Sequence, residues 1–423
     1  MLRKVYNNTQ ESRVAANFGI LLLAVSFITG FLPYAYSVIK HGGSAYQSGD
    51  WLINYEGGFV RRGLIGQLIL IISPNGTLGL IFLLIIQTSF YFLVFVFFAY
   101  TLVNSKSSWI RTVLICSPSG LCFSGWDIGG FGRKEIIGYA VLILLSIRAN
   151  LKQNLFASRI LVWASFIVFI IGVLSWEPIA LFLPFILFLI RLGFSIDQHL
   201  VERKLTQSFF VVFGLLGFLL SINFKGTPKI ANEICTALRN NGFNGSDICS
   251  GAINAIGWTS SYTLNKVQES FPLYIFYLPL FALAVAPLVL SRVLVGLEKF
   301  ALISFFTISP LFFVVNDYGR WISLYYVSIV IILIASNRIE SCNASIMDNK
   351  KVALLFLLSW GLPHVVMPNS TFPIKGAIVT PVEIFFSYSL VFKIVYAASF
   401  LFIGVFFSLL SSAKWTRANS SSK

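Results

Sequence analysis

The chain consists largely of long apolar runs in which charges are rare, and this pattern constrains its fold more than any motif does. Hydrophobic residues make up 57% of the 423 residues, and charged residues make up 11%. Stretches such as residues 78–103 are apolar on every face of a helix, whereas the strands of a membrane barrel alternate apolar and polar residues. The sequence therefore predicts an all-α, polytopic integral membrane helical bundle.

Apolar stretches near 20 residues in length predict about twelve transmembrane helices. They fall near residues 17–39, 78–103, 109–123, 136–147, 160–175, 178–192, 207–222, 272–291, 300–315, 321–336, 352–367 and 388–410. Segment 64–72 is too short to cross and is predicted to be interfacial or re-entrant. We expect a single transmembrane domain over residues 1–412, followed by a short basic tail over residues 413–423. Its outer loops are expected near residues 40–77, 124–135, 223–271 and 368–387.

The distribution of basic residues predicts the orientation of the chain. If the N-terminus is cytoplasmic, most of the 31 Lys and Arg residues lie on the cytoplasmic side, as the positive-inside rule requires. Both termini are then cytoplasmic, and the first apolar run is a retained signal anchor. The formal charge of +15 follows from these loops and requires no nucleic-acid partner.

Two of the predicted outer loops carry related patterns of charge and glycine. Residues 48–66 read SGDWLINYEGGFVRRGLIG, and residues 124–138 read SGWDIGGFGRKEIIG. Each places an acid before Gly-Gly-Phe and a basic pair after it. NDYGRW at residues 316–321 partly repeats the pattern, and SWEP at residues 175–178 adds a further acid at an outer turn.

These loops supply the candidate site residues. The candidate catalytic carboxylates are Asp50, Asp127, Glu177 and Asp317, and the candidate substrate-binding residues are Glu56, Arg61, Arg62, Arg133, Lys134 and Arg320. A charge near hydrocarbon costs a few kcal/mol unless it is solvated or paired, so such placement favours a function. Arginines bind phosphate bidentately, and glycines let backbone N–H groups approach an anion. The clusters therefore predict a site for an anionic substrate.

Each cluster also has a purely structural interpretation. The acids and arginines of residues 50–62 can form a solvated loop that ends the first helix. Asp127 can pair with Arg133 and Lys134 to hold a turn, and Asp317 can pair with Arg320 across one helical turn. Glu177 can be a charge favoured at a helix start. Four separate outer turns with the same unusual chemistry favour the functional interpretation.

The cysteines and histidines give one further prediction. Cys235 and Cys249 both lie in the polar outer loop 223–271, where an oxidising compartment favours a disulfide between them. The three histidines, His41, His199 and His364, are scattered along the sequence and predict no metal cluster or catalytic triad.

The chain resembles the type C membrane glycosyltransferases, which use polyprenyl-phosphate-linked sugars on the outer face of the membrane. The resemblance covers the architecture of residues 1–320 and the acid that follows the first span in Gly49-Asp50-Trp51. It implies that Asp50 is the catalytic base toward the acceptor or a ligand of a divalent cation. The chain departs from the family pattern because it lacks a soluble C-terminal domain and a paired-acid motif, which puts metal dependence in doubt.

The chain is also similar to O-antigen polymerases, which bind lipid-linked pyrophosphates through arginines in large outer loops. These resemblances predict glycosyl transfer from a polyprenyl-linked sugar in a bacterial inner membrane, during assembly of envelope polysaccharide, with a polymerase as the alternative. A lipid-linked-sugar flippase or anion transporter is a non-enzymatic alternative. A transporter is expected to carry its charges deep within helices, whereas these lie near helix ends.

Overall fold

The structure consists of helices and connecting segments. The computed structural model describes residues 2–73, 75–104, 108–151, 155–194, 200–270, 272, 274–341, 346–365 and 376–399. Within these ranges every regular element is a helix, and the predicted all-α class is confirmed. A helix satisfies its backbone N–H and C=O groups within one segment, as a chain immersed in hydrocarbon requires.

Five helices in the described ranges are long and apolar enough to cross a membrane. They are α1 (Leu2–His41), α3 (Gly76–Asn104), α7 (Leu155–Ser175), α9 (Leu200–Asn223) and α16 (Tyr318–Ala335). In its most apolar window α16 is 94% buried within the protein, whereas α9 is 22% buried. The first is therefore a central helix, and the second directs most of its apolar surface outward.

Other predicted spans are interrupted. Residues 109–123 form α4 (Trp109–Cys116) and α5 (Phe123–Trp126), with Pro118 in the turn between them. Ser117 is extended, with φ −48° and ψ 140°, because the residue before a proline disfavours the helical conformation. Two further predicted spans are each divided into a pair of helices. The pairs are the 3-10 helix η2 (Glu177–Phe182) with α8 (Leu183–Gly193), and α14 (Glu298–Ile308) with α15 (Leu311–Val314).

The remaining predicted spans correspond to shorter helices. These are α6 (Glu135–Asn150), α13 (Tyr274–Leu290), α17 (Lys350–Leu358) and the helix Leu390–Ser399. The ends of the last two predicted spans, and the basic tail over residues 413–423, lie outside the described residues. The count of twelve crossings therefore stays a prediction.

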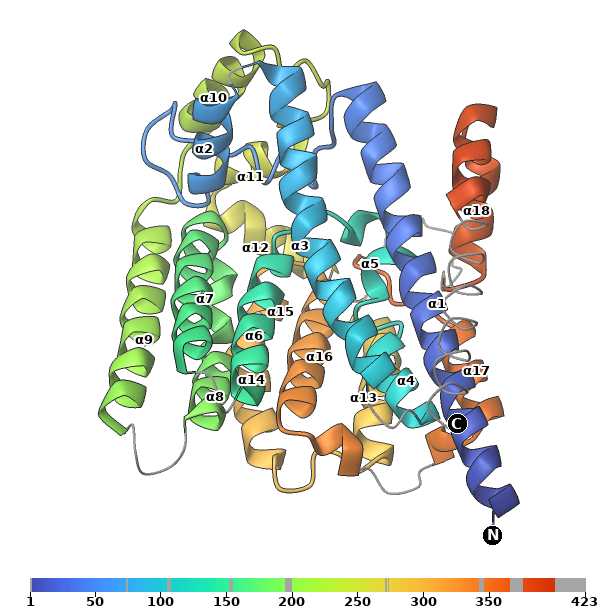
Figure 1. The fold of residues 1–423 in the computed structure, drawn as a ribbon. Coiled ribbons are helices and arrows are strands. Elements are labelled where there is room, and N and C mark those ends of the chain that lie inside the picture. The colour runs from blue at the N-terminus through green and yellow to red at the C-terminus, as the bar shows by residue number, and fades with distance from the viewer. Residues whose placement is uncertain are drawn as a thin grey trace.

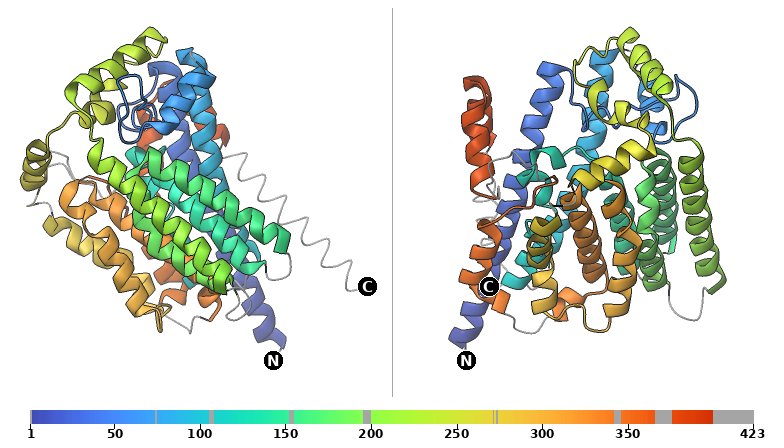
Figure 2. Two further views of the ribbon diagram at one scale, coloured as in Figure 1. Left: turned by 90° about the vertical axis from the view of Figure 1, so that its left-hand side faces the viewer. Right: turned by 180° about the vertical axis from the view of Figure 1, so that it is seen from behind.

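The long helices run between two ends of the molecule, and a layer of short helices covers the upper end. The N-terminus lies at the lower end, and α1 and α3 rise above most of the bundle (Figure 1). Beside their upper ends lie α2 (Leu64–Ile72), α10 (Pro228–Asn240) and α11 (Asn254–Ile256), which we call the upper layer (Figures 1 and 2). The segment predicted to be interfacial or re-entrant is α2. Below this layer, α6 packs against α7, α8 and α16.

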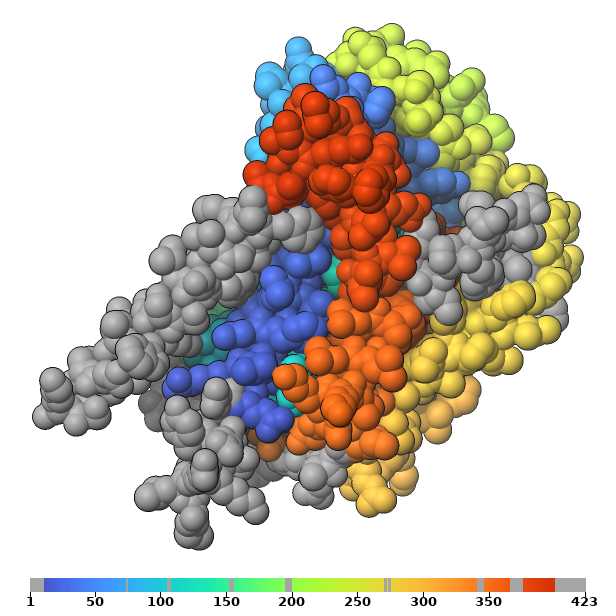
Figure 3. Space-filling model, turned by 90° about the vertical axis from the view of Figure 1, so that its right-hand side faces the viewer, coloured from blue at the N-terminus to red at the C-terminus, as the bar shows by residue number. Residues whose placement is uncertain are grey.

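A separate contact holds α18 (Val379–Ser387) and the helix after it along α1 (Figure 3). The ring of Tyr36 lies 5.5 Å from that of Tyr388 and 5.4 Å from that of Phe392, measured between centroids. Thr29 and Tyr396 form a hydrogen bond of 3.1 Å. The four aromatic residues belong to a small apolar cluster apart from the main core.

A disulfide joins α10 of the upper layer to the segment that precedes α11. It links Cys235 in α10 to Cys249 at the start of η3 (Cys249–Ile253), the pairing that the sequence predicts. The following residues contact the loop between α1 and α2, because the N–H of Ala252 donates to the carbonyl of Ala45 at 3.0 Å. A Cβ atom on Gly251 would lie 2.5 Å from the same carbonyl oxygen, so this contact requires glycine. The upper layer thus braces the loop that carries Asp50.

We expect Cys235 and Cys249 to be oxidised to each other in protein purified without reductant. The cross-link closes a short loop, which constrains the unfolded chain by about 3 kcal/mol in the chain-entropy model. Serine at both positions should therefore lower the thermal stability of the protein. Peptide mapping after alkylation, with and without reduction, measures the pairing. Two alkylated thiols in the unreduced protein would contradict it.

Labelling with a membrane-impermeant maleimide tests the orientation. Lys229 lies in α10 of the upper layer with its side chain 85% exposed, and Lys204 is exposed near the start of α9. We expect Lys229→Cys to react in intact cells and Lys204→Cys to react only after permeabilisation, because basic connections stay cytoplasmic. The two free cysteines of the described chain, Cys116 and Cys122, are buried and serve as internal controls. The reverse labelling pattern would invert the topology.

Candidate functional site

The two related loops of the sequence pack against each other below the upper layer. The Trp51 indole N–H donates to the carbonyl of Gly132 at 2.8 Å. The side-chain amide of Gln47 donates to the carbonyls of Ile128 and Phe131 at 2.8 and 2.7 Å. The buried amide of Gln87, from α3, also donates to the Gly132 carbonyl, at 2.9 Å. These bonds fix the turn that carries Asp50 beside the start of α6.

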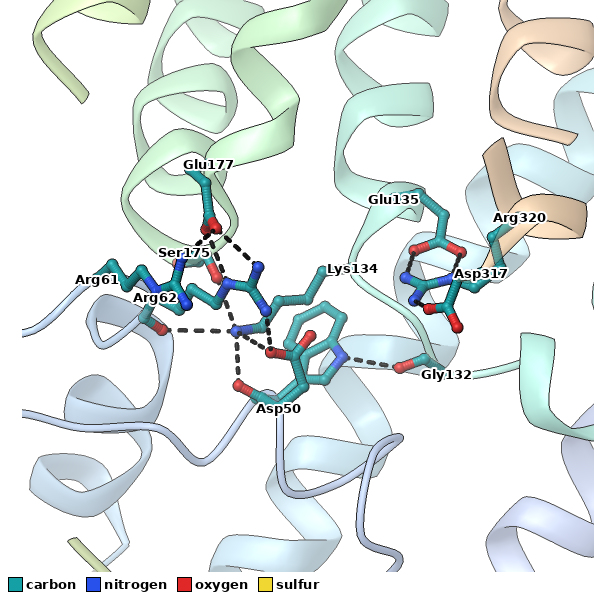
Figure 4. A network of polar contacts seen from close by, with 11 residues as sticks. Asp50, Arg61, Arg62, Gly132, Lys134, Glu135, Ser175, Glu177, Asp317 and Arg320 are labelled. Atoms are coloured by element: carbon teal, nitrogen blue, oxygen red, sulfur yellow. Dashed lines mark hydrogen bonds and ion pairs between the residues drawn. The ribbon is translucent and has the colours of Figure 1, made fainter. Parts of the chain in front are cut away.

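Glu177 at the start of η2 forms ion pairs with Arg61 and Arg62 of the first loop (Figure 4). Arg62 donates to both carboxylate oxygens of Glu177, each at 2.7 Å, and Arg61 donates to one at 3.3 Å. Arg62 has φ 70°, a left-handed conformation that costs a non-glycine residue about 1–2 kcal/mol. The bidentate ion pair offsets this cost and holds the arginine toward Glu177.

Lys134 connects three segments through its ammonium group. The group donates to the carbonyls of Asp50 at 2.6 Å and of Ser175 at 2.7 Å, and the side chain is fully buried. It also lies 3.6 Å from Asp50 Oδ1. A direct substrate contact at Lys134 would require these bonds to break, so its geometry is that of a positioning residue.

The Asp50 carboxylate is buried between two cations without a hydrogen bond. Arg62 lies 3.7 Å from Oδ1, the same oxygen that Lys134 approaches (Figure 4). Oδ1 is buried, and no hydrogen-bond donor from the described residues reaches it. Buried polar atoms normally have a partner, so an oxygen in this condition is suited to receive a donor from a substrate or water.

A second ion-pair group lies on the other side of Lys134 in Figure 4. Arg320, in the first turn of α16, donates to Glu135 at 3.1 and 2.7 Å and also pairs with Asp317. The Arg320 guanidinium is thus already paired with the carboxylates of Glu135 and Asp317. Arg133 donates from Nε to the carbonyl of Gly129 at 2.9 Å, and its backbone N–H donates to Tyr91. Its two terminal nitrogens have no acceptor among the described residues.

Asp127 pairs with His364, which is not among the site residues predicted from the sequence. His364 Nδ1 lies 2.8 Å from both carboxylate oxygens of Asp127, and its backbone N–H also donates to that carboxylate. The imidazole is 28% exposed, so Nε2 can face a ligand while Nδ1 is held. The two residues are 237 positions apart, and no local spacing signals their contact.

The predicted residues therefore converge in part. Five form one cluster, which we call the Asp50 cluster: Asp50, Arg61, Arg62, Lys134 and Glu177. Asp317 and Arg320 belong to the adjoining group with Glu135, whereas Asp127 pairs with His364 and Arg133 donates to Gly129 in the same turn as Asp127. Glu56 is exposed, and its carboxylate accepts a hydrogen bond of 3.1 Å from the side-chain amide of Gln67. No ion pair joins Glu56 to the Asp50 cluster among the described residues.

Charge compensation decides which groups remain available to an anion. Five carboxylates face five Lys or Arg side chains across the two groups and the Asp127 turn, so the region is nearly balanced when His364 is neutral. Arg61 has a buried Nε without an acceptor in the described chain, and its side chain is 30% exposed. Among the basic residues of the site, Arg61 and Arg133 thus have N–H groups left over to donate hydrogen bonds to an anion.

Burial and ion pairing shift the pKa values of the site in opposite directions. Burial alone would raise the pKa of Glu177, but the charges of Arg62 and Arg61 outweigh it and lower the pKa to about 2. Burial lowers the pKa of Lys134 to about 8, although Asp50 partly offsets this effect. Burial would likewise raise the pKa of Asp317, and Arg320 and Arg133 lower it. The arginines thus favour the ionised form of Glu177, which suits it to hold Arg62 and Arg61 in place.

The surroundings of Asp50 do not fit a divalent cation. Two positive side chains lie within 3.7 Å of its carboxylate and would repel a metal ion. Within the described residues no group of three or more His, Cys, Asp or Glu side chains has the arrangement of a metal site. The chemistry available at Asp50 is that of a carboxylate positioned by cations.

Comparison of the chain with protein-family models, curated proteins and solved structures finds no match. The function therefore has to be inferred from the site itself.

Replacing Lys134 tests its positioning role. Lys134→Met leaves the buried carbonyls of Asp50 and Ser175 without their donor, which should lower the free energy of unfolding by about 1–3 kcal/mol. Because burial lowers the folded-state pKa of Lys134 to about 8, below the 10.5 of an exposed lysine, the unfolded chain binds more protons between these two pH values. The contribution of Lys134 to stability should therefore rise from pH 8 to 10.5.

Thermal unfolding of the purified protein across this pH range measures both effects. The exposed Lys225→Met is the matched control and should change neither the stability nor its pH dependence. Equal stability of wild type and Lys134→Met at every pH would show that the ammonium bonds do not hold the site.

Proposed function

We propose that the chain catalyses glycosyl transfer from a polyprenyl-phosphate-linked sugar, on the outer face of a bacterial inner membrane. The observation that carries this proposal is the buried Asp50 carboxylate, which lies where three outer turns meet and accepts no hydrogen bond at Oδ1 from the described residues. A general base needs a free lone pair directed at the proton that it removes. Asp50 has one.

The proposed reaction joins an acceptor hydroxyl to the anomeric carbon of the donor. The acceptor oxygen forms the new bond to that carbon while the carbon–oxygen bond to the phosphate breaks. Asp50 takes the proton of the attacking hydroxyl, and the polyprenyl phosphate leaves with the bonding electrons. Arg61 and Arg133 stabilise the charge that develops on the leaving phosphate, because each has donors available.

An apolar groove near Glu177 supports a lipid-linked substrate. The groove has a volume of about 640 Å³ and is lined mainly by α8 and α9, with Ile303 and Thr307 from α14. It begins at Ala180, three residues after Glu177 in η2, and continues past Leu183 and Leu187. A polyprenyl chain in this groove would place its phosphate at the Asp50 cluster.

The proposal includes the full topology. Twelve crossings, with some built from broken helices, would place both termini in the cytoplasm and the Asp50 cluster toward the periplasm. Interrupted helices are tolerated at membrane depth where they are buried in protein or line a cavity. Of the short helices in these interrupted segments, η2 begins at Glu177 and α5 ends directly before Asp127.

Substitution of Asp50 separates catalysis from binding. Asp50→Asn removes the charge with little change in volume, so it should abolish sugar transfer while lipid-linked donor still binds. Arg61→Ala should weaken donor binding by about 1.5–3 kcal/mol, the value of a charge-assisted hydrogen bond. Product formation from a lipid-linked sugar pool in membranes and binding of the donor to purified protein are measured separately.

Matched controls come from the same outer face. Glu56→Gln removes an exposed acid from the Asp50 loop, and Lys225→Ala removes an exposed base next to Phe224, whose carbonyl accepts from the N–H of Arg61. Both variants should retain transfer and binding. Full product formation by Asp50→Asn would reject Asp50 as the base and move the assignment to the Asp127 and His364 pair. Altered translocation without any product would favour a transporter.

A further inference from the structure

A second cavity lies at the lower end of the bundle, away from the Asp50 cluster. It has a volume of about 910 Å³ and is lined by the C-terminal ends of α6 and α8 and the N-terminal ends of α7 and α9. Glu135 begins α6 at the site, whereas Arg148 lies 13 residues later at the cavity, about 20 Å along the helix. The cavity is therefore separate from the proposed reaction.

Four arginines line this cavity: Arg148, Arg159, Arg191 and Arg203. The one carboxylate among the described lining residues is Glu202, which lies 3.6 Å from Arg159 and is thus already paired. The lining consequently carries an excess of three positive charges. Such a charge excess in a partly enclosed site attracts an anion.

Arg148 gives the strongest indication of a missing anion. Its side chain is buried, with 4% of the residue exposed, and no ion pair joins it to any described residue. The guanidinium lies 3.8 Å from the centre of the Phe194 ring and donates to Ser158 at 3.2 Å. A Cβ atom on Gly193 would lie 2.5 Å from Arg148 Nη1, so glycine makes room for this placement. A buried charge without a counter-ion is unfavourable, and a bound anion would compensate it.

The rest of the lining is apolar and aromatic. Trp163, Phe166, Phe209 and Phe210 contribute to it, and Trp163 is 57% exposed on the outer surface of the bundle. A small inorganic anion gains nothing from such walls, whereas the chain of a lipid does. Basic pockets between membrane helices on the cytoplasmic side are suited to anionic head groups.

We propose that this cavity binds the phosphate head group of an anionic membrane lipid. Arg148, Arg191 and Arg203 contact the phosphate, and the aromatic residues pack against the first part of the acyl chains. The inference does not rest on the Asp50 cluster, which lies at the opposite end of α6, although Arg191 also lines the groove proposed for the polyprenyl chain. Free phosphate shares the head-group chemistry and is distinguished in the experiment.

Native mass spectrometry of the purified full-length protein tests the proposal. The probes are dioleoyl phosphatidylglycerol, dioleoyl phosphatidylcholine and inorganic phosphate. We expect the protein to retain phosphatidylglycerol in preference to phosphatidylcholine. Because each charge-assisted contact contributes about a tenfold change in affinity or more, the double variant Arg191→Gln/Arg203→Gln should lose most of that preference. Arg148→Gln should lose it as well.

Lys204→Gln is the matched control, because it removes the same charge one residue from Arg203 without lining the cavity. It should retain the lipid as wild type does. Arg148 is buried, and its replacement can also affect folding. The double variant keeps Arg148 and changes two side chains at helix ends, so it tests lipid binding without removing the buried arginine. Equal retention of the two lipids, or unchanged retention by the double variant, would overturn the proposal. Displacement of phosphatidylglycerol by millimolar inorganic phosphate would assign the cavity to a soluble anion and overturn the lipid assignment.

Discussion

The Asp50 cluster depends on the bonds from one buried ammonium group to two carbonyls. Lys134 immediately precedes α6 and donates to the carbonyl of Asp50, in the loop after α1, and to that of Ser175, at the end of α7. These are carbonyls of non-helical turns and helix ends, which lack intrahelical partners. One side chain thereby fixes three segments that are far apart in the sequence and sets the distance of the Asp50 carboxylate from both of its cations.

The chemistry of the site is visible in the sequence, but its pairing is not. Charges on glycine-rich turns of an apolar chain stand out, and Asp50, Arg62 and Glu177 can be selected on that basis alone. That Arg62 pairs with Glu177, 115 residues away, depends on the packing of η2 against the first loop. His364 is a sharper case, because a single histidine carries no local pattern and acquires its meaning from contact with Asp127.

The helices show the same division between composition and packing. Apolar runs locate the membrane-compatible segments, since hydrocarbon selects for composition over about 20 residues. They do not show where a run is divided. The predicted span at residues 109–123 contains Pro118, and the chain turns there instead of continuing as one helix. Such breaks bring backbone groups to the interior, where buried side chains can bond to them.

The near balance of charge around Asp50 has a consequence for the glycosyl transfer that we propose. Arg62 already holds Glu177 through two short bonds, so an incoming anion that reaches this arginine exchanges one counter-ion for another. The free energy of such an exchange is the difference between two similar ion pairs, which is small even when each pair is strong. In the proposed reaction, such an exchange would let the site bind a phosphate and still release it, because Glu177 remains beside Arg62 to restore the original ion pair.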